Sequence, residues 1–277
     1  MRWTPGGVSG NIEDQRGGGG GFGGGRVGIV GLIIAGVLSI IFGRDFITPL
    51  LSTGGGAVAT SPADSERSRA EDPQVQFVSF VLDDVQNTWR KTLGPRYQDA
   101  RLVLFRDVVQ SACGSADSAT GPFYCPGDAK VYIDLSFFDE LARRFGAPGD
   151  FAQAYVLAHE LGHHVQNLLG ISTKVRRAQQ ADPSQANALS VRLELQADCF
   201  AGVWGHSTDQ RGILEKGDVD EGLAAAASVG DDRLQKQARG YVSPDSFTHG
   251  TSAQRAQWFR RGFSTGDVGS CNTFEAR

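Results

Sequence analysis

The chain has 277 residues, of which 40% are hydrophobic and 21% charged, an ordinary mixture for a globular protein. Glycine is the exception, because 18 of the 37 glycines fall within the first 60 residues. The formal net charge is −4, and the excess of acidic residues lies beyond residue 71. A mildly acidic body lacks the basic surface that binds a phosphate backbone, so we expect no nucleic-acid partner.

An uncharged apolar segment occupies residues 27–43, between Arg26 and Arg44. As a helix it would reach roughly 25 Å, the short limit for crossing a hydrocarbon core. It therefore predicts a single transmembrane anchor. Two alternatives remain: a cleaved signal peptide with a small-residue site at 57–59, and a buried core helix, which the glycines in the segment disfavour.

The distribution of arginine predicts how the anchor is oriented. Three arginines precede the apolar segment, whereas only Arg44 closely follows it. By the positive-inside tendency, residues 1–26 form a glycine-rich cytoplasmic arm. Residues 44–71, rich in small residues, proline and charge, are expected to be a stalk that leads to an extracytoplasmic domain at 72–277.

All four cysteines follow the apolar segment, which agrees with an oxidising compartment. Cys113 and Cys125 bracket a short loop of small and polar residues and are the favoured local pair. A second disulfide between Cys199 and Cys271 would tie a helix to the carboxy-terminal tail. Four unrelated buried thiols are the alternative.

Secondary structure in the body is mixed. Helical spacing of apolar residues predicts an amphipathic helix over 77–89. Short strands are predicted at 102–105 and 131–133, and the second is a candidate edge for pairing with an extended peptide.

Two long helices are predicted after the strands. The first begins at Asp150, an N-cap with Gln153 placed for a capping box, and stops at Gly170. The second starts near Asp182 and ends at Gly205. Few strands and several helices predict an α+β fold that is mostly helical.

The first long helix carries the sequence His159-Glu160-Leu161-Gly162-His163. Two histidines four residues apart lie on one helix face, so both imidazoles can reach one Zn²⁺. Glu160 is placed to deprotonate a water activated by the metal. A pair of surface histidines is the structural alternative.

A third zinc ligand is needed, and Glu194 on the second helix is the candidate. Asp198 shares its face and can accept the second ring N–H of a ligand histidine. The small residues Ala197 and Ala201 would let this helix approach the first closely. An exposed acidic pair is the alternative.

An HExxH helix followed by a helix with the pattern ExxAD resembles the gluzincin metallopeptidases. More narrowly, the chain resembles the bacterial family of “putative neutral zinc metallopeptidases” from its MRW start, through FYCP at 123–126, to AHELGHHVQ and ELQADCFAG. The resemblance implies a zincin-like metallopeptidase domain with a small sheet. It also implies one zinc per chain on His159, His163 and Glu194, with Glu160 catalytic.

The remaining histidines are weaker candidates. His164 points away from His163, and His206 lies just beyond the predicted end of the second helix. His249, followed by Arg255, is similar to a His-then-Arg segment that some membrane-linked gluzincins bring to the active site, where a donor stabilises the oxyanion. A structural role beside a capped helix explains His249 equally well.

The sequence as a whole predicts a membrane-anchored zinc peptidase acting on a peptide or protein substrate. Two alternatives belong to other classes. One is a catalytically silent, zinc-binding membrane scaffold or assembly protein; the other is a channel or assembly factor acting through the glycine-rich span, which only Gly31 and Ala35 favour.

Overall fold

The computed structural model describes residues 1–17 and 62–275. The chain divides into two compact units, Met1–Gln15 with Ala70–Arg277, and Arg16–Arg69, and the first of these is described below. The predicted anchor at 27–43 and the alternative cleavage site at 57–59 lie outside the described residues. Among the helices that the structure does describe, none has the length and apolar character needed to span a membrane.

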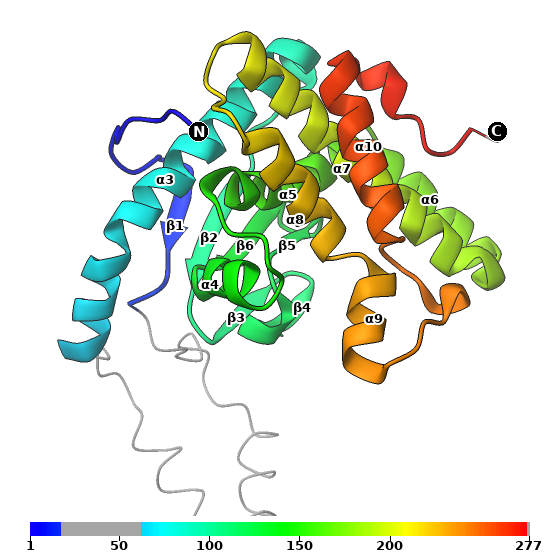
Figure 1. Cartoon of the computed structure of the whole chain (residues 1–277), viewed down its shortest axis with the longest axis horizontal. Coiled ribbons are helices and arrows are strands. Elements are labelled where there is room, and N and C mark those ends of the chain that lie inside the picture. The colour runs from blue at the N-terminus through cyan, green and yellow to red at the C-terminus, as the bar shows by residue number, and fades with distance from the viewer. Residues whose placement is uncertain (18–61, 276–277) are drawn as a thin grey trace, which may run out of the picture. The chain divides into compact units, whose positions relative to one another are not determined.

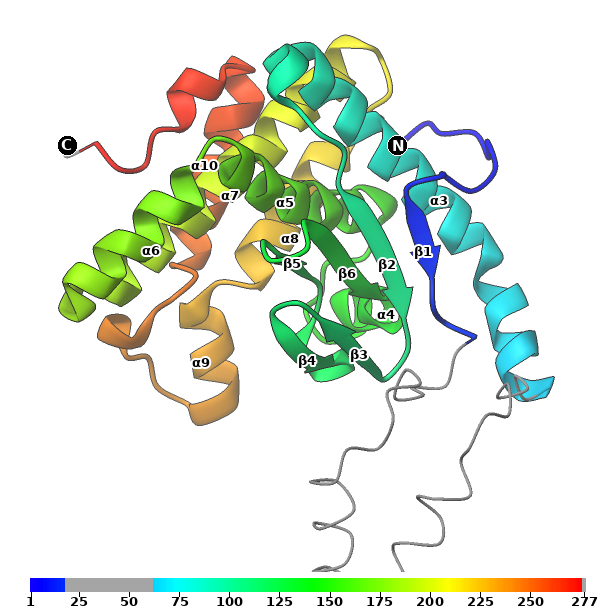
Figure 2. The ribbon, with the colours of Figure 1, turned by 180° about the vertical axis from the view of Figure 1, so that it is seen from behind.

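A four-stranded sheet stands beside a two-stranded hairpin (Figures 1 and 2). The larger sheet has the order β1-β2-β6-β5, with β1, β2 and β6 parallel and β5 antiparallel to β6. Its strands are β1 (Ile12–Asp14), β2 (Arg101–Phe105), β5 (Phe123–Cys125) and β6 (Lys130–Asp134), and the hairpin is β3 (Val108–Ser111) and β4 (Gly114–Asp117). The strands predicted at 102–105 and 131–133 are confirmed. The second was wrong as an edge, because β6 is paired on both sides and β5 is the outer strand.

Eight helices are described, which confirms a mostly helical α+β fold. They are α3 (Pro62–Leu93), α4 (Ser136–Arg143), α5 (Asp150–Leu168), α6 (Ile171–Ala181), α7 (Ala186–Gln210), α8 (Asp218–Ser228), α9 (Asp231–Arg239) and α10 (Ser252–Thr265). The predicted stalk is partly wrong, since α3 begins at residue 62. The second long helix does not end at Gly205 but continues to Gln210.

The start of α5 differs in detail from the prediction. Asp150 is its first residue, and Gly149 takes the N-cap position without a side-chain cap. The capping box with Gln153 does not form. Instead, the backbone N–H of Phe151 donates to Oε2 of Glu221 at 3.2 Å, so α8 caps this helix from a distance in sequence.

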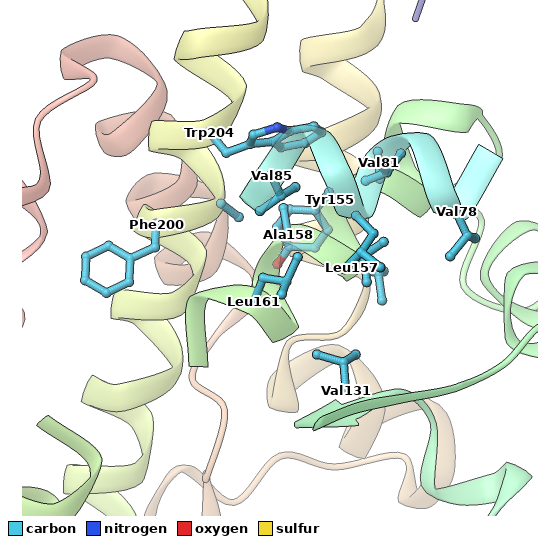
Figure 3. Close-up of a cluster of buried hydrophobic side chains, with 14 of the residues drawn as sticks. Val78, Val81, Val85, Val131, Tyr155, Leu157, Ala158, Leu161, Phe200 and Trp204 are labelled. Carbon is cyan, nitrogen blue, oxygen red and sulfur yellow. The ribbon is translucent and has the colours of Figure 1, made fainter. Parts of the chain in front are cut away.

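The two faces of the larger sheet pack into two different cores, because successive side chains of a strand point to opposite faces. Leu102 and Leu104 of β2 belong to the main core with the helices, whereas Val103 and Phe105 belong to a smaller core with Val109 of the hairpin. Figure 3 shows the main core, in which side chains of α3, α5, β6 and α7 gather around one centre.

Close helix contacts depend on small residues. A Cβ on Gly162 would lie 3.1 Å from the carbonyl oxygen of Ala197, which confirms the predicted close approach of α5 and α7. A Cβ on Gly262 would lie 1.9 Å from the carbonyl oxygen of Cys199, so α10 packs against α7 with no room for a side chain there. The predicted disulfides are both confirmed: Cys199–Cys271 joins α7 to the segment after α10, and Cys113–Cys125 joins the hairpin to β5.

The first fifteen residues fold with the domain. The amino group of Met1 lies 2.7 Å from Oδ1 of Asp150 and 3.2 Å from Oδ2 of Asp218. The hydroxyl of Ser9 donates to Asp83 of α3 at 2.7 Å. Strand β1 completes the sheet by pairing with β2. These contacts attach the amino-terminal segment to α3, α5 and α8 as well as to the sheet.

The predicted boundaries are therefore wrong at the amino terminus. Residues 1–15 are part of the domain and not of a separate arm at 1–26, and the domain does not begin at 72. A single-pass topology with residues 1–26 in the cytoplasm and the domain outside would also separate β1 from β2. That topology is incompatible with the observed strand pairing.

Residues 1–15 and the rest of the domain should lie on one side of any membrane. Val8 and Val242 are both exposed, at 61% and 40%, and sit in these two parts. We expect single Val8→Cys and Val242→Cys variants of the full chain, in intact cells, to react alike with a membrane-impermeant maleimide. Labelling after permeabilisation is the control, and protection of one cysteine alone would contradict the shared sheet.

Candidate metal centre

Helices α5 and α7 bring three predicted ligands together. Nε2 of His159 lies 3.2 Å from Oε2 of Glu194, and Nε2 of His163 lies 3.3 Å from Oε1 of the same carboxylate. The two imidazole rings, one helical turn apart, have centroids 4.8 Å apart. One ligand atom from each of the three residues lies within 4.8 Å of the other two.

This donor set fits Zn²⁺. Two imidazole nitrogens and one carboxylate form a common three-ligand set that leaves a fourth position open. Ligand atoms about 2.1 Å from a tetrahedral ion lie about 3.4 Å from one another. The observed separations of 3.2 and 3.3 Å between Glu194 and the two ring nitrogens agree with that value.

The second nitrogen of each imidazole has its own partner. Nδ1 of His159 lies 2.9 Å from Oδ1 of Asp198, and Nδ1 of His163 lies 2.8 Å from Oε1 of Gln166. Both partners are acceptors, so each Nδ1 carries a proton, and Nε2 is the nitrogen of each ring that remains available to a metal ion. Asp198 was singled out from the sequence, but Gln166 was missed although it lies three residues after His163.

Asp198 is fully buried and accepts hydrogen bonds from three side chains. Besides His159, the hydroxyl of Tyr155 donates to Oδ1, and Arg255 donates from Nε to Oδ2 at 2.8 Å and from Nη2 to Oδ1 at 2.9 Å. Tyr155 lies one turn before His159 on α5, and Arg255 comes from α10. The sequence pattern of α7 gave no sign of either contact.

Burial and charge shift the pKa values in the cluster. Burial raises the pKa of Glu194, but His163 and His159 outweigh it and hold that pKa well below its usual range. Burial lowers the pKa of His159, but Asp198 and Glu194 outweigh it and raise the pKa to about 10. For Glu160, burial is the largest influence and raises the pKa above its ordinary value.

The other histidines lie outside the three-ligand cluster. His164 is buried, with Nε2 donating to the carbonyl of Gln98 at 2.6 Å and Nδ1 accepting from the hydroxyl of Tyr124 at 3.0 Å. Nδ1 of His206 donates to the carbonyl of Phe263 at 2.8 Å. Both rings therefore hold elements together.

His249 has a different position. It lines the same cleft as the metal ligands, and its side chain is 49% exposed. Its Nδ1 lies 3.2 Å from Oδ1 of Asp231, and this carboxylate is the main reason that the pKa of His249 is raised. The ring is thus fixed at the cleft without being a member of the ligand cluster.

The ligands open into a cleft of about 1000 Å³. His159, Glu160 and His163 of α5 line it together with Glu194 of α7, and Phe123 of the outer strand β5 borders it. This volume is at the upper end of the range for small-molecule sites, which favours a larger or extended ligand.

Comparison with known proteins agrees with this geometry. A sequence profile of the family described as “putative neutral zinc metallopeptidase” matches residues 1–274. The chain belongs to this family. It is 50% identical to “Uncharacterized protein YpfJ” of Escherichia coli (strain K12) over 287 aligned positions, which cover 99% of each chain.

More distant relatives cover less of the chain. The chain is 45% identical to “Uncharacterized protein Rv2575” of Mycobacterium tuberculosis over 205 positions, 70% of this chain and 68% of the relative. No solved structure matches the chain.

Glu194 and Asp198 should differ in their effect on metal binding. Glu194→Ala removes the carboxylate whose two oxygens face His159 and His163, so we expect a severe loss of zinc affinity. Asp198→Ala removes no proposed ligand but leaves the His159 ring, Tyr155 and Arg255 without their shared acceptor, and loss of such support costs about 10- to 100-fold in affinity. Zinc titration against a competing chelator measures both, and Asp209→Ala, an exposed position on the same helix, is the control. Intact affinity in Glu194→Ala would mean that the third ligand is another residue.

Proposed function

We propose that the protein is a zinc-dependent peptidase that hydrolyses peptide bonds. The observation that carries the proposal is the position of Glu160 in the cleft beside a three-residue donor set that fits Zn²⁺. Bound there, Zn²⁺ would supply a Lewis acid that polarises the scissile carbonyl and acidifies a water. Membership of the family supports the same reaction class.

The chain's own residues supply the proton transfers. Glu160 follows the first ligand directly on α5, and its carboxylate takes the proton of the attacking water and delivers it to the leaving amine. The raised pKa of this buried carboxyl suits both the acceptance and the release of a proton. His249, oriented by Asp231, is the proposed donor to the oxyanion.

We further propose that the domain works in an oxidising compartment outside the cytoplasm. The two disulfides support this location, because such bonds persist where thiols are oxidised. Membrane attachment through residues 27–43 remains part of the proposal, but as a contact with one side of the bilayer and not as a single crossing. Since residues 1–15 fold with the domain, they lie on its side of the membrane.

Replacement of the proposed base tests the mechanism. Glu160→Gln keeps the size of the side chain but cannot accept a proton. We expect the variant to bind one zinc per chain with an affinity close to that of the unmodified protein. Hydrolysis of an unstructured protein should fall by at least about 10²-fold, the usual contribution of a general base.

Zinc content and initial rates should be measured on the same preparations of the full chain. Asp209→Ala again serves as the exposed control and should keep both properties. Unchanged hydrolysis in a zinc-loaded Glu160→Gln variant would exclude this mechanism. No hydrolysis by the zinc-loaded, unmodified chain would favour a catalytically silent zinc-binding scaffold.

A further inference from the structure

Three short helices wall the cleft, and each contributes one face. On each of these helices the residues that line the cleft are three or four positions apart, as expected when a single helix face borders a groove. Examples are Phe137 and Glu140 of α4, Ser172 and Arg176 of α6, and Leu234 and Ala238 of α9. Helix α5 carries the reacting groups, so the polarity of the cleft is described below along that helix.

The cleft is apolar beside the amino-terminal half of α5. Val156 lies three residues before His159 and four before Glu160, so it is on the same helix face, one turn away from the reacting groups. The rings of Phe137 and Phe145, with centroids 6.2 Å apart, line the same cleft, and the charged Glu140 and Arg144 next to them are exposed. This end of the cleft is suited to a large apolar side chain.

Helix α9 closes the apolar pocket. Nη2 of Arg233 donates to the carbonyl of Phe145 at 3.0 Å, which fixes α9 against the end of α4. The next residue, Leu234, faces the cleft. Val229, just before α9, also lines it, and its carbonyl accepts a hydrogen bond from Arg255 at 3.3 Å. The pocket is thus connected to the side chains that hold His159.

The opposite end of the cleft is polar. Beyond His163, helix α6 contributes the polar Ser172, Arg176 and Gln179 to the wall, with the buried Val175 between them. Arg176 is exposed at the rim. A substrate segment lying along α5 therefore meets an apolar pocket on one side of the reacting groups and a polar wall on the other.

Apart from Glu160 and Glu194, which the proposed chemistry uses, the charged residues that the structure describes along the cleft are either paired or exposed. Arg255 is bound to Asp198, and His249 is paired with Asp231. Arg144 is exposed and paired with Glu140, 3.8 Å away. A substrate's terminal carboxylate or amine would need a buried partner of opposite charge to bind tightly there, and the exposed Arg176 at the rim is not one.

We infer that this protein is an endopeptidase for extended interior segments of polypeptide, with a large apolar side chain next to the scissile bond held by Phe137, Phe145, Val156 and Leu234. The outer strand β5, whose Phe123 and Tyr124 line the cleft, offers its edge for main-chain pairing with such a segment. The inference rests on the proposed peptidase function.

The test uses the zinc-loaded full chain and a mixture of random peptides, prepared with free termini or with acetylated and amidated termini. We expect both forms to be cut at equal rates within the chain. Mass spectrometry of the products should find large apolar residues enriched at one fixed position relative to the cut. The Glu160→Gln variant shows which cuts arise from this active site.

A charge placed in the pocket should change the preference. We expect Leu234→Lys to shift the favoured residue at that position from apolar to acidic, with at least a tenfold change in the ratio of the two kcat/KM values. Val242→Lys adds the same charge at an exposed position that does not line the cleft, and it should keep the original ratio. Zinc content must be equal in the three proteins.

The outcomes distinguish failure of this inference from failure of the proposed peptidase function. Release of single terminal residues, or slower cutting of the blocked peptides, would refute the endopeptidase. Cuts with no preference at any position, or an unchanged preference in Leu234→Lys, would refute the apolar pocket while leaving the peptidase intact. No Glu160-dependent cleavage of either peptide set would refute the function and the inference together.

Discussion

The buried carboxylate of Asp198 is the group on which the candidate metal centre depends. It joins three helices, since Asp198 belongs to α7, its partners Tyr155 and His159 to α5, and Arg255 to α10. An ion so deeply buried is tolerated only with opposite charge and hydrogen bonds around it, and removal of one partner from such a pair costs about 3–5 kcal/mol. The orientation of His159 is therefore set by the same contacts that hold α10 in place.

Backbone packing makes this arrangement possible. The position of Gly162 next to Ala197 lets α5 approach α7 closely enough for Glu194 to reach both histidines. On the other side of α7, Gly262 lets α10 lie against the backbone at Cys199, and the Cys199–Cys271 disulfide closes the same contact. The small residues and the disulfide thus fix the separation of α7 and α10, and with it the distance between Arg255 and Asp198.

The sequence predicted those parts of the site that are local. Residues three or four apart on one helix must share a face, so the ligand pair on α5 and the Glu194–Asp198 pair on α7 could be read from spacing. The close approach of the two helices followed from glycine and alanine at matching places. Gln166 was within reach of the same reasoning, because it lies three residues after His163 on the same helix.

The parts that the sequence did not predict depend on distant contacts. Arg255 meets Asp198 across 57 positions of sequence, and no local pattern encodes that pairing. Strand β1 has only three residues, and its place in the sheet depends on a partner 90 positions away. The short helices α4, α6 and α9 were missed for another reason: each has 11 residues or fewer, too few for a helical spacing of apolar residues to stand out.

The charges of the centre explain why its groups suit a divalent cation. With neutral histidines, the carboxylates of Glu160, Glu194 and Asp198 contribute three negative charges, and Arg255 contributes one positive charge. The excess of two lies in a buried site, where it is costly unless matched by positive charge. A proton shared among these groups meets part of that need, which is why the pKa of His159 is raised to about 10. A dication held by the Nε2 atoms and Glu194 would meet all of it, so metal binding would stabilise the folded domain as well as prepare it for chemistry.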